Sequence, residues 1–220
     1  MINNNLKEQA NIFFEKWYTE SADLEQELSK IIEVRDGTHD SPKPKETGYP
    51  LVTSKHLMPF CIDLESPNKI SKEDYDKANA RSKVDKYDIL MSMIGTIGLV
   101  SFVHQDIINF AIKNVALFKT SKYKDFSYYL LLFLQSSLAK QYLDVSAAGS
   151  TQQYISLAML RKIPIKIPSK ESLDYFNQVI EPIINKMCQN SNENKYLASI
   201  RDLLLPKLMS GELDVSEILI

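Results

Sequence analysis

The feature that most constrains this fold is a heptad-like run near the C-terminus. Its seam positions, spaced by three or four residues, are Ile183, Met187, Asn190, Asn194, Leu197, Arg201 and Leu204. Pro182 fits the first turn of such a helix, and Pro206 and Gly211 are expected to end it after roughly 24 residues, or ~36 Å. Because its centre is polar and its ends are apolar, this helix is not a self-sufficient core element and is expected to pack on another helix.

One possible partner lies at the N-terminus of the same chain. The apolar positions of a first predicted helix are Leu6, Ala10, Phe13 and Trp17, and those of a shorter second one, capped by Ser21, are Leu24, Leu28 and Ile31. The spacing of four, three and four residues places the first set on one helical face. The C-terminal helix is therefore expected to pack on this face or on a helix of another chain.

Between residues 33 and 168 the chain has the texture of short strands. Five apolar runs are bounded by Gly, Pro, Asp or Ser: PLVTSKHL, YDILMSMIG, IGLVSFV, NVALFKT and IPIKIP. Gly95 and Gly98 indicate a bulge or a tight strand connection. The segment FSYYLLLFLQSSLAKQYL is apolar nearly all round and predicts one buried helix.

This pattern predicts an α+β fold. We expect one mixed α/β domain over residues 21–170. It would be flanked by an N-terminal helix over 1–20 and by a helical region over 171–220 that contains a long coiled-coil-like helix.

Composition limits the function classes. The chain has 220 residues and a formal net charge of −2, so nucleic acid would have to bind at a local face rather than in a global basic field. Its two cysteines, Cys61 and Cys188, match no metal spacing, which indicates a reduced, cytoplasmic protein.

Catalytic motifs are missing from the sequence. The three histidines His39, His56 and His104 do not form a helical metal-binding pattern, and no nucleophile elbow, phosphate loop, dinucleotide loop or adenine-methyltransferase motif occurs. We therefore expect a non-catalytic chain without a metal or cofactor of its own.

Three polar stretches are candidates for contacts with nucleic acid. The first, RDGTHDSPKPK, is expected to turn at Asp36–Gly37 with Gly37 at positive φ, and Pro42 and Pro44 stiffen it. Such a loop suits hydrogen bonds to phosphates and base edges. The alternative is an ordinary surface loop in which Thr38 and Asp40 bond their own backbone.

The other two stretches allow similar pairs of interpretations. In AAGSTQQYISL the glutamines could pair with adenine, or Ser150 or Thr151 could cap a helix. The lysines of residues 69–86 and 113–124 would contact phosphates or would simply form solvated faces. The candidate DNA-contacting residues are Thr38, His39, Lys43, Lys45, Ser54, Lys55, Lys69, Lys72, Arg81, Lys83, Thr151, Gln152 and Gln153.

Four segments, in this order, resemble the specificity subunit of type I restriction–modification systems. They are DGTHDSPKPKETGYPLVTSKHL, RSKVDKYDILMSMIGTIGLV, AAGSTQQYISLAMLRKIPIKIP and IRDLLLPKLMSGELDV. The resemblance spans about residues 31 to 215. It implies a target recognition domain that reads one half of a split double-stranded DNA site. It also implies long helices that join two such domains.

The resemblance further implies partners. A specificity subunit holds modification subunits, which bind S-adenosylmethionine and methylate adenine, and restriction subunits join that complex to cleave unmodified DNA. Motifs shared by members with different targets are expected to be structural. Asp36, Gly37, Thr38 and Gly149 would then shape the fold or bind phosphate or a partner, and residues 43–46 and 69–86 would read bases.

This sequence departs from the family pattern because it holds a single recognition domain. Its opening LKEQANIFFEKWYTE resembles the spacer segment that normally follows the first domain, and IPSKESLDYFNQ lacks the usual Glu-Gln pair. We therefore expect a half-subunit that pairs through its helices, as a homodimer or with another half-subunit. The alternative is a helical assembly protein that binds modification subunits without reading DNA.

Overall fold

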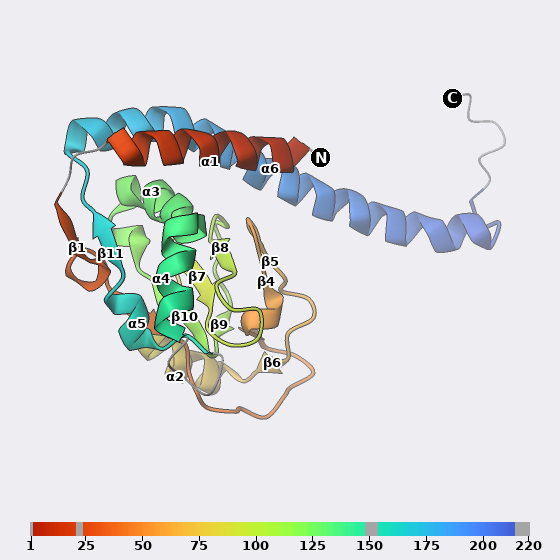
Figure 1. Cartoon of the computed structure of the whole chain (residues 1–220). Coiled ribbons are helices and arrows are strands. Elements are labelled where there is room, and N and C mark those ends of the chain that lie inside the picture. The colour runs from red at the N-terminus through yellow and green to blue at the C-terminus, as the bar shows by residue number, and fades with distance from the viewer. Residues whose placement is uncertain (1, 21–23, 148–153, 214–220) are drawn as a thin grey trace, which may run out of the picture.

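A computed structural model describes residues 2–20, 24–147 and 154–213. Its helices are α1 (Ile2–Glu20), α2 (Lys72–Ser82), α3 (Lys124–Gln135), α4 (Ser137–Ala147), α5 (Leu157–Arg161) and α6 (Lys170–Met209). Its strands are β1 (Glu25–Glu27), β2 (Val34–Asp36), β3 (Tyr49–Val52), β4 (Leu57–Met58), β5 (Cys61–Ile62), β6 (Lys69–Ile70), β7 (Ile89–Ser92), β8 (Val100–Phe102), β9 (Ala111–Ile112), β10 (Val115–Phe118) and β11 (Pro164–Lys166). The mixed α/β architecture with helices at both ends confirms the predicted fold class (Figure 1).

A four-stranded antiparallel sheet in the order β2-β10-β7-β8 forms the centre of the domain. Both of its faces are buried. On β7, Ile89 and Met91 join one apolar cluster, whereas Leu90 joins a second cluster on the opposite face. This alternation explains why these strands read as continuous apolar runs.

The two faces carry different layers. Helix α3 covers one face and separates the sheet from α1 and α6, as Figure 1 shows. The other face packs toward the small sheet β6-β3-β9, in which β3 and β9 are parallel. Two-stranded pairs β1-β11 and β4-β5 complete the strand pairing of the described residues.

Helix α1 packs antiparallel on the first half of α6. Trp17 contacts Phe176 with ring centroids 4.6 Å apart, and at the other end Asn3 donates a hydrogen bond to the Met187 carbonyl at 3.1 Å. Tyr129 of α3 fills the junction between the two helices through further ring contacts. Of the two partners expected for the C-terminal helix, the N-terminal helix of the same chain therefore packs on its first half. Beyond it, the second half of α6 extends past the domain (Figure 1).

Helix boundaries differ from the prediction in three places. Residues 24–31 form β1 and a short 3-10 turn, Leu28–Lys30, rather than a second helix, because β1 pairs with β11. The apolar helix predicted over 126–143 is broken at Ser136, whose side chain bonds the Phe133 carbonyl at 2.6 Å. Pro182 and Pro206 lie inside the single helix α6 instead of at its ends.

Each of the five predicted strand runs contains a strand, and Gly95 and Gly98 form a tight connection between β7 and β8. Both glycines have positive φ, at 79° and 77°, a conformation that costs glycine little. The helices of the described part include no segment long and apolar enough to cross a membrane.

Candidate functional site

Polar side chains gather where the loops of the domain meet α2. We call this surface the loop face and define it by Thr38–Asp40, Thr53–Lys55, Ile94–Thr96, Lys113–Asn114, Tyr154–Leu157, Lys77 and Arg81. Three hollows adjoin here: His39 lines the first and the third, and Ile94 and Asn114 line the first and the second. Helices α2 and α5, which border the loop face, lie at the end of the domain farthest from α1 and α6 (Figure 1).

A hydrogen-bond network runs from the interior to the loop face. Asp36 is buried and accepts hydrogen bonds from Arg81 and, at 2.9 Å, from His39 Nε2. The other ring nitrogen of His39 lies 2.7 Å from Asn114 Oδ1. Burial of Asp36 opposes its ionisation, but the bonds from Arg81 and His39 outweigh that effect and lower the pKa of its carboxyl.

Gly37 is required by close packing. A Cβ at this position would lie 2.4 Å from the Ile112 carbonyl oxygen. The expected turn with positive φ is wrong, because Asp36 ends strand β2 and Gly37 continues its pairing by donating to the Val115 carbonyl. Gly37 therefore allows β2 and β9 to approach each other.

Thr38 lies in the same tight crossing. Its backbone N–H donates to the Ile112 carbonyl at 2.9 Å, and its hydroxyl accepts a hydrogen bond from the Asp40 N–H at 3.1 Å. The side chain thus bonds its own loop, as the surface-loop alternative expected. These bonds hold His39 in position beside Asn114.

Most cations around α2 have anionic partners. Lys72 pairs with Asp76, Lys77 with Asp40, Arg81 with Asp36 and Lys83 with Asp85. The Lys77 ammonium lowers the pKa of the Asp40 carboxyl. Pairing leaves these cations exposed but reduces the net positive charge of the α2 surface.

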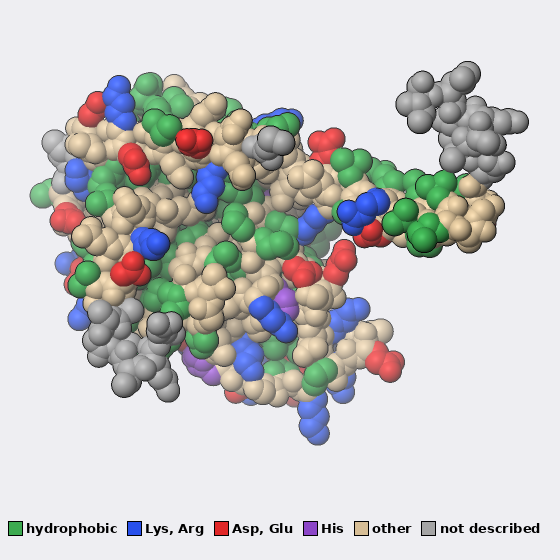
Figure 2. Space-filling model, turned by 45° about the vertical axis from the view of Figure 1, so that its right-hand side comes forward, with side chains coloured by type: hydrophobic (Ala, Val, Ile, Leu, Met, Phe, Trp, Pro, Cys, Tyr) green, Lys and Arg blue, Asp and Glu red, His purple; other side chains and the backbone are tan. Residues whose placement is uncertain are grey.

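Three lysines of the loops differ from this group. Within the described ranges, Lys43, Lys45 and Lys55 are exposed and have no acidic partner. Figure 2 shows Lys and Arg side chains spread over this lower end of the domain. Lys69 is half-buried in β6, and Ser54 begins a 3-10 turn, Ser54–His56, next to Lys55. Free cations are the groups best placed to meet phosphates.

The lysines of residues 113–124 divide into different roles. Lys119 is buried, and its ammonium donates to Asp88 at 2.6 Å and to Asp85 at 2.8 Å. Removing it would leave the buried Asp88 carboxylate without its cation, so Lys119 is structural. Lys113 donates to the Ser41 hydroxyl at 2.6 Å on the loop face.

The other sequence candidates fall into two groups. Thr151, Gln152 and Gln153 lie outside the described residues. Among the candidate helical-interface residues, Ala10, Trp17 and Met187 are buried, and Leu6, Phe13 and Ile183 pack against the same cluster. Asn190 donates to Asn3 at 2.8 Å, while Asn194, Leu197 and Leu204 are exposed.

Sequence reasoning missed Asn114 and Tyr154 as loop-face residues. Asn114 has a positive φ of 52°, and its backbone N–H donates to the Thr38 carbonyl. A single Asn between two short strands carries no periodic signal. Only the unusual tolerance of Asn for left-handed backbone could have pointed to this position.

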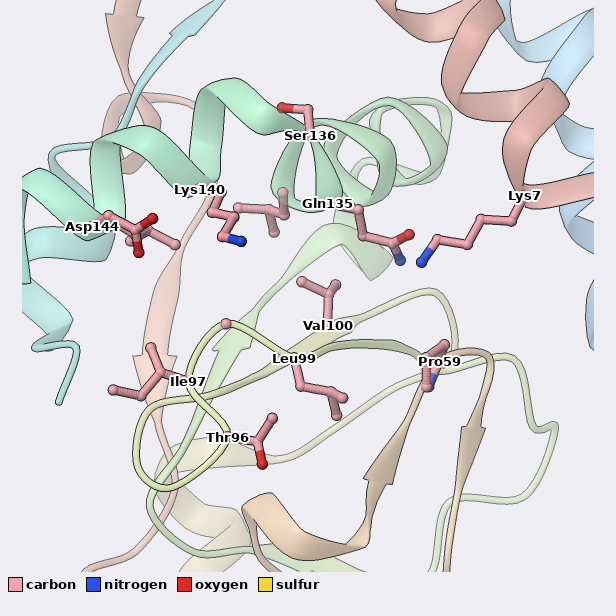
Figure 3. Close-up of a pocket in the computed structure, with 13 residues that line it drawn as sticks. Lys7, Pro59, Thr96, Ile97, Leu99, Val100, Gln135, Ser136, Lys140 and Asp144 are labelled. Atoms are coloured by element: carbon pink, nitrogen blue, oxygen red, sulfur yellow. The ribbon is translucent and has the colours of Figure 1, made fainter. Parts of the chain in front are cut away.

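A further hollow of about 320 Å³ lies on the helical side of the domain, shown in Figure 3. Lys7 of α1 and Gln135 at the end of α3 point toward each other, and Lys140 and Asp144 of α4 line the other side. Thr96 belongs to both this hollow and the loop face. The β7–β8 connection therefore borders both surfaces.

In the part of the chain that the structure describes, no group of three or more His, Cys, Asp or Glu side chains could hold a metal ion. What the loop face offers instead is hydrogen-bond donors and acceptors, exposed ammonium groups and an apolar hollow. Groups of these kinds are the ones that contact phosphates and base edges in protein–DNA complexes.

Comparison with solved structures identifies the fold. The S subunit of a type I restriction–modification system from M. genitalium superposes with a TM-score of 0.61 at 17% identity, covering 94% of this chain and 54% of that one. The HsdS subunit from Thermoanaerobacter tengcongensis gives a TM-score of 0.51 at 14% identity, covering 96% and 53%. At these identities the likeness concerns the fold alone.

Sequence comparison identifies the family. The type I restriction enzyme HindI specificity subunit of Haemophilus influenzae is 34% identical over 62% of this chain and 30% of its own length. The MjaIX specificity subunit of Methanocaldococcus jannaschii is 26% identical over 87% of this chain and 44% of its own length, so the chain spans less than half of these relatives. The model of the type I restriction modification DNA specificity domain matches residues 25–202, and the chain therefore belongs to that family.

Proposed function

We propose that this chain is a non-catalytic, sequence-specific DNA-binding module. It would direct the adenine methyltransferase subunits, and the restriction subunit, of a type I restriction–modification complex to one half of a split DNA site. The family match over residues 25–202 is the observation that carries this proposal. The bound S-adenosylmethionine would belong to the modification subunit, and this chain would need no cofactor.

The loop face is the surface that supports DNA recognition. Exposed Lys43, Lys45 and Lys55 offer charges for phosphates, which position a protein on the duplex without reading sequence. Asn114 and the side chains around it offer the donors and acceptors that base edges require. A net charge of −2 means that such binding depends on this local surface and on the partner subunits.

Methylation mapping tests the proposal. The chain would be co-expressed with a modification subunit of its system, and methylated adenines would be mapped on the genomic DNA of the host. A split motif that disappears when this chain is omitted is the expected result. Methylation without a defined motif would argue against sequence recognition.

Helical assembly is the second candidate function, and the exposed part of α6 favours it. Leu203, Leu204, Leu205 and Leu208 are between 39% and 63% exposed, and Figure 2 shows hydrophobic side chains along this projecting segment. A homodimer, or a pair with another half-subunit, would cover them. Two identical domains in a homodimer would read a symmetric split site, whereas a pure assembly protein would bind modification subunits with no preference among DNA sequences.

A further inference from the structure

Asn114 occupies an unusual position on the loop face. It lies in the turn between β9 and β10 with a positive φ of 52°, a conformation that few residues other than Gly, Asn and Asp adopt readily. Its side chain is a wall shared by two hollows, one with His39 and Tyr154 and the other with Ser54 and Lys55. A duplex lying across the loop face would therefore meet the Asn114 amide between these two hollows.

The Asn114 amide is held from inside the domain. Its Oδ1 lies 2.7 Å from His39 Nδ1, and His39 Nε2 lies 2.9 Å from Asp36, which also binds Arg81. The side chain of Asp36 is 10% exposed and that of His39 is 63% exposed, so the network starts at a buried carboxylate and ends at the surface. A polar group fixed in this way loses little conformational entropy when it binds a ligand.

The groups that remain available on Asn114 fit one kind of base edge. Whichever ring nitrogen of His39 carries the proton, its contact engages one site of the Asn114 amide, so the side chain keeps a free acceptor lone pair and at least one free N–H. A donor beside an acceptor is the pattern that pairs with N7 and N6 of adenine in the major groove. The adjoining hollow of about 560 Å³, walled by Ile94, Tyr154 and Leu157, leaves apolar surface for the neighbouring base.

We propose that Asn114 is a specificity-determining residue that reads one adenine of the half-site through its amide, with His39 as its positioning residue. This inference rests on the proposed DNA-recognition function and names the side chain that carries part of it. The adenine in question is read within the duplex and is distinct from the one that is methylated.

Two substitutions test this inference with little disturbance of the backbone. Asn114→Gly keeps the positive φ at no steric cost and removes the amide. Asn114→Asp keeps the shape but offers only acceptors, which suit the N4 amino group of cytosine. Asn109→Asp, at an exposed position before the other end of β9, is the matched control. Thermal unfolding of each purified variant would verify that the fold is retained.

The readout is the methylation motif of each variant, co-expressed with the modification subunit. With Asn114→Gly we expect one adenine position of the motif to lose its preference by roughly 10- to 100-fold. With Asn114→Asp we expect the same position to shift toward cytosine, while Asn109→Asp leaves the motif unchanged. His39→Ala should relax the same position without affecting the others.

The possible failures are distinguishable. If the wild-type chain yields a split motif and both Asn114 variants methylate the same motif with unchanged preferences, the role of Asn114 is refuted and the recognition function stands. A relaxed position that held a base other than adenine would overturn the adenine assignment. If the wild-type chain yields no motif, the recognition function fails and this inference fails with it.

Discussion

The two halves of α6 have similar helical seams but opposite surroundings. In the first half Phe176, Ile180 and Ile184 are fully buried against α1 and α3. In the second half Leu197 and Leu203 are 54% and 63% exposed. The difference teaches that the apolar periodicity of a helix specifies that it will be covered, but not by which chain.

The second half of α6 receives less support from the described part of this chain than the first half does. Isolated helices of about a dozen residues are marginal in water, and Pro206 removes one of its backbone hydrogen bonds. Tertiary contacts supply most helical stability in proteins, so a partner helix is the expected source here. This is why we expect the two halves to respond differently to substitution.

Truncation of Phe176 gives the largest expected effect. Phe176→Ala opens a cavity among Phe14, Trp17 and Tyr129, and should cost about 3–5 kcal/mol of unfolding free energy. Leu205→Ala in the exposed half should cost less than about 0.5 kcal/mol at a concentration where the chain is monomeric. Urea denaturation of both variants measures the contrast, and similar losses would contradict it.

The next largest effect is expected on helical pairing, when leucines in the exposed half of α6 are replaced by serine. Leu204→Ser with Leu208→Ser should leave the unfolding free energy of the monomer nearly unchanged but weaken helical pairing by at least about tenfold. Light scattering at tens of micromolar provides the measurement. A wild-type chain that is monomeric under these conditions would show that self-pairing does not cover this surface.

The control for that experiment lies on the same helix. The control variants are Asn192→Ala and Lys186→Ala. Both residues are exposed and lie on α6 outside the exposed leucines of residues 203–208. Both should leave the molecular mass in solution unchanged. A loss of pairing in these variants would place the contact elsewhere on α6.

Strands β3, β7, β8, β10 and β11 could be predicted from the sequence because their apolar runs are short and bounded by turn residues, whereas β1, β2, β5, β6 and β9 lie outside the predicted runs. Ile89, Leu90 and Met91 are continuous because both faces of the sheet are buried. The buried face of α1 was also predictable, because its apolar residues recur at helical spacing. Ala10 and Trp17 of that face are buried.

The failures arose where tertiary contacts overrode local signals. Pro182 marked a helix start in the sequence, but buried Ile180 and Ile184 on either side keep the helix continuous. Residues 25–27 form a strand only because β11, some 140 positions later, offers its edge. Such long-range pairing leaves no local trace.

The candidate site was predicted in part. The loop around Thr38 and His39 was identified from its composition, because a stiff, hydroxyl-rich and basic loop is unusual between apolar runs. Asn114 could not be found in this way, since its role depends on its distance from His39, 75 positions earlier. The sequence also does not show which lysines lack an acidic partner. Lys119 looks like a surface lysine in the sequence, but in the fold it is buried and paired with Asp88.

A smaller loss of unfolding free energy is expected at Asn190, where the packed first half of α6 ends. Asn190→Ala removes the hydrogen bond to Asn3, which joins α6 to α1, and should cost about 1 kcal/mol. The exposed Asn192→Ala should cost almost nothing by comparison. Equal values for the two variants would show that the Asn3–Asn190 contact does not stabilise the packed half.

The smallest effect concerns the point where the two halves separate. Lys195 donates to the Ile62 carbonyl at 2.9 Å and ties α6 to β5 near the edge of the domain. Lys195→Met keeps the apolar stem, so the unfolding free energy should fall by less than about 0.5 kcal/mol. Hydrogen exchange is the more sensitive measurement, because local opening can change without global unfolding.

We expect Lys195→Met to accelerate exchange in residues 197–209 and to leave residues 176–190 unchanged. Lys186→Met, on an exposed face of the packed half, is the matched control and should change neither segment. Faster exchange throughout α6 would mean that its halves open as one unit, and the contrast between them would then lie only in exposure. Exchange that rises in the second half alone would show that the Lys195–Ile62 hydrogen bond stabilises α6 locally, at the point where the helix leaves the domain.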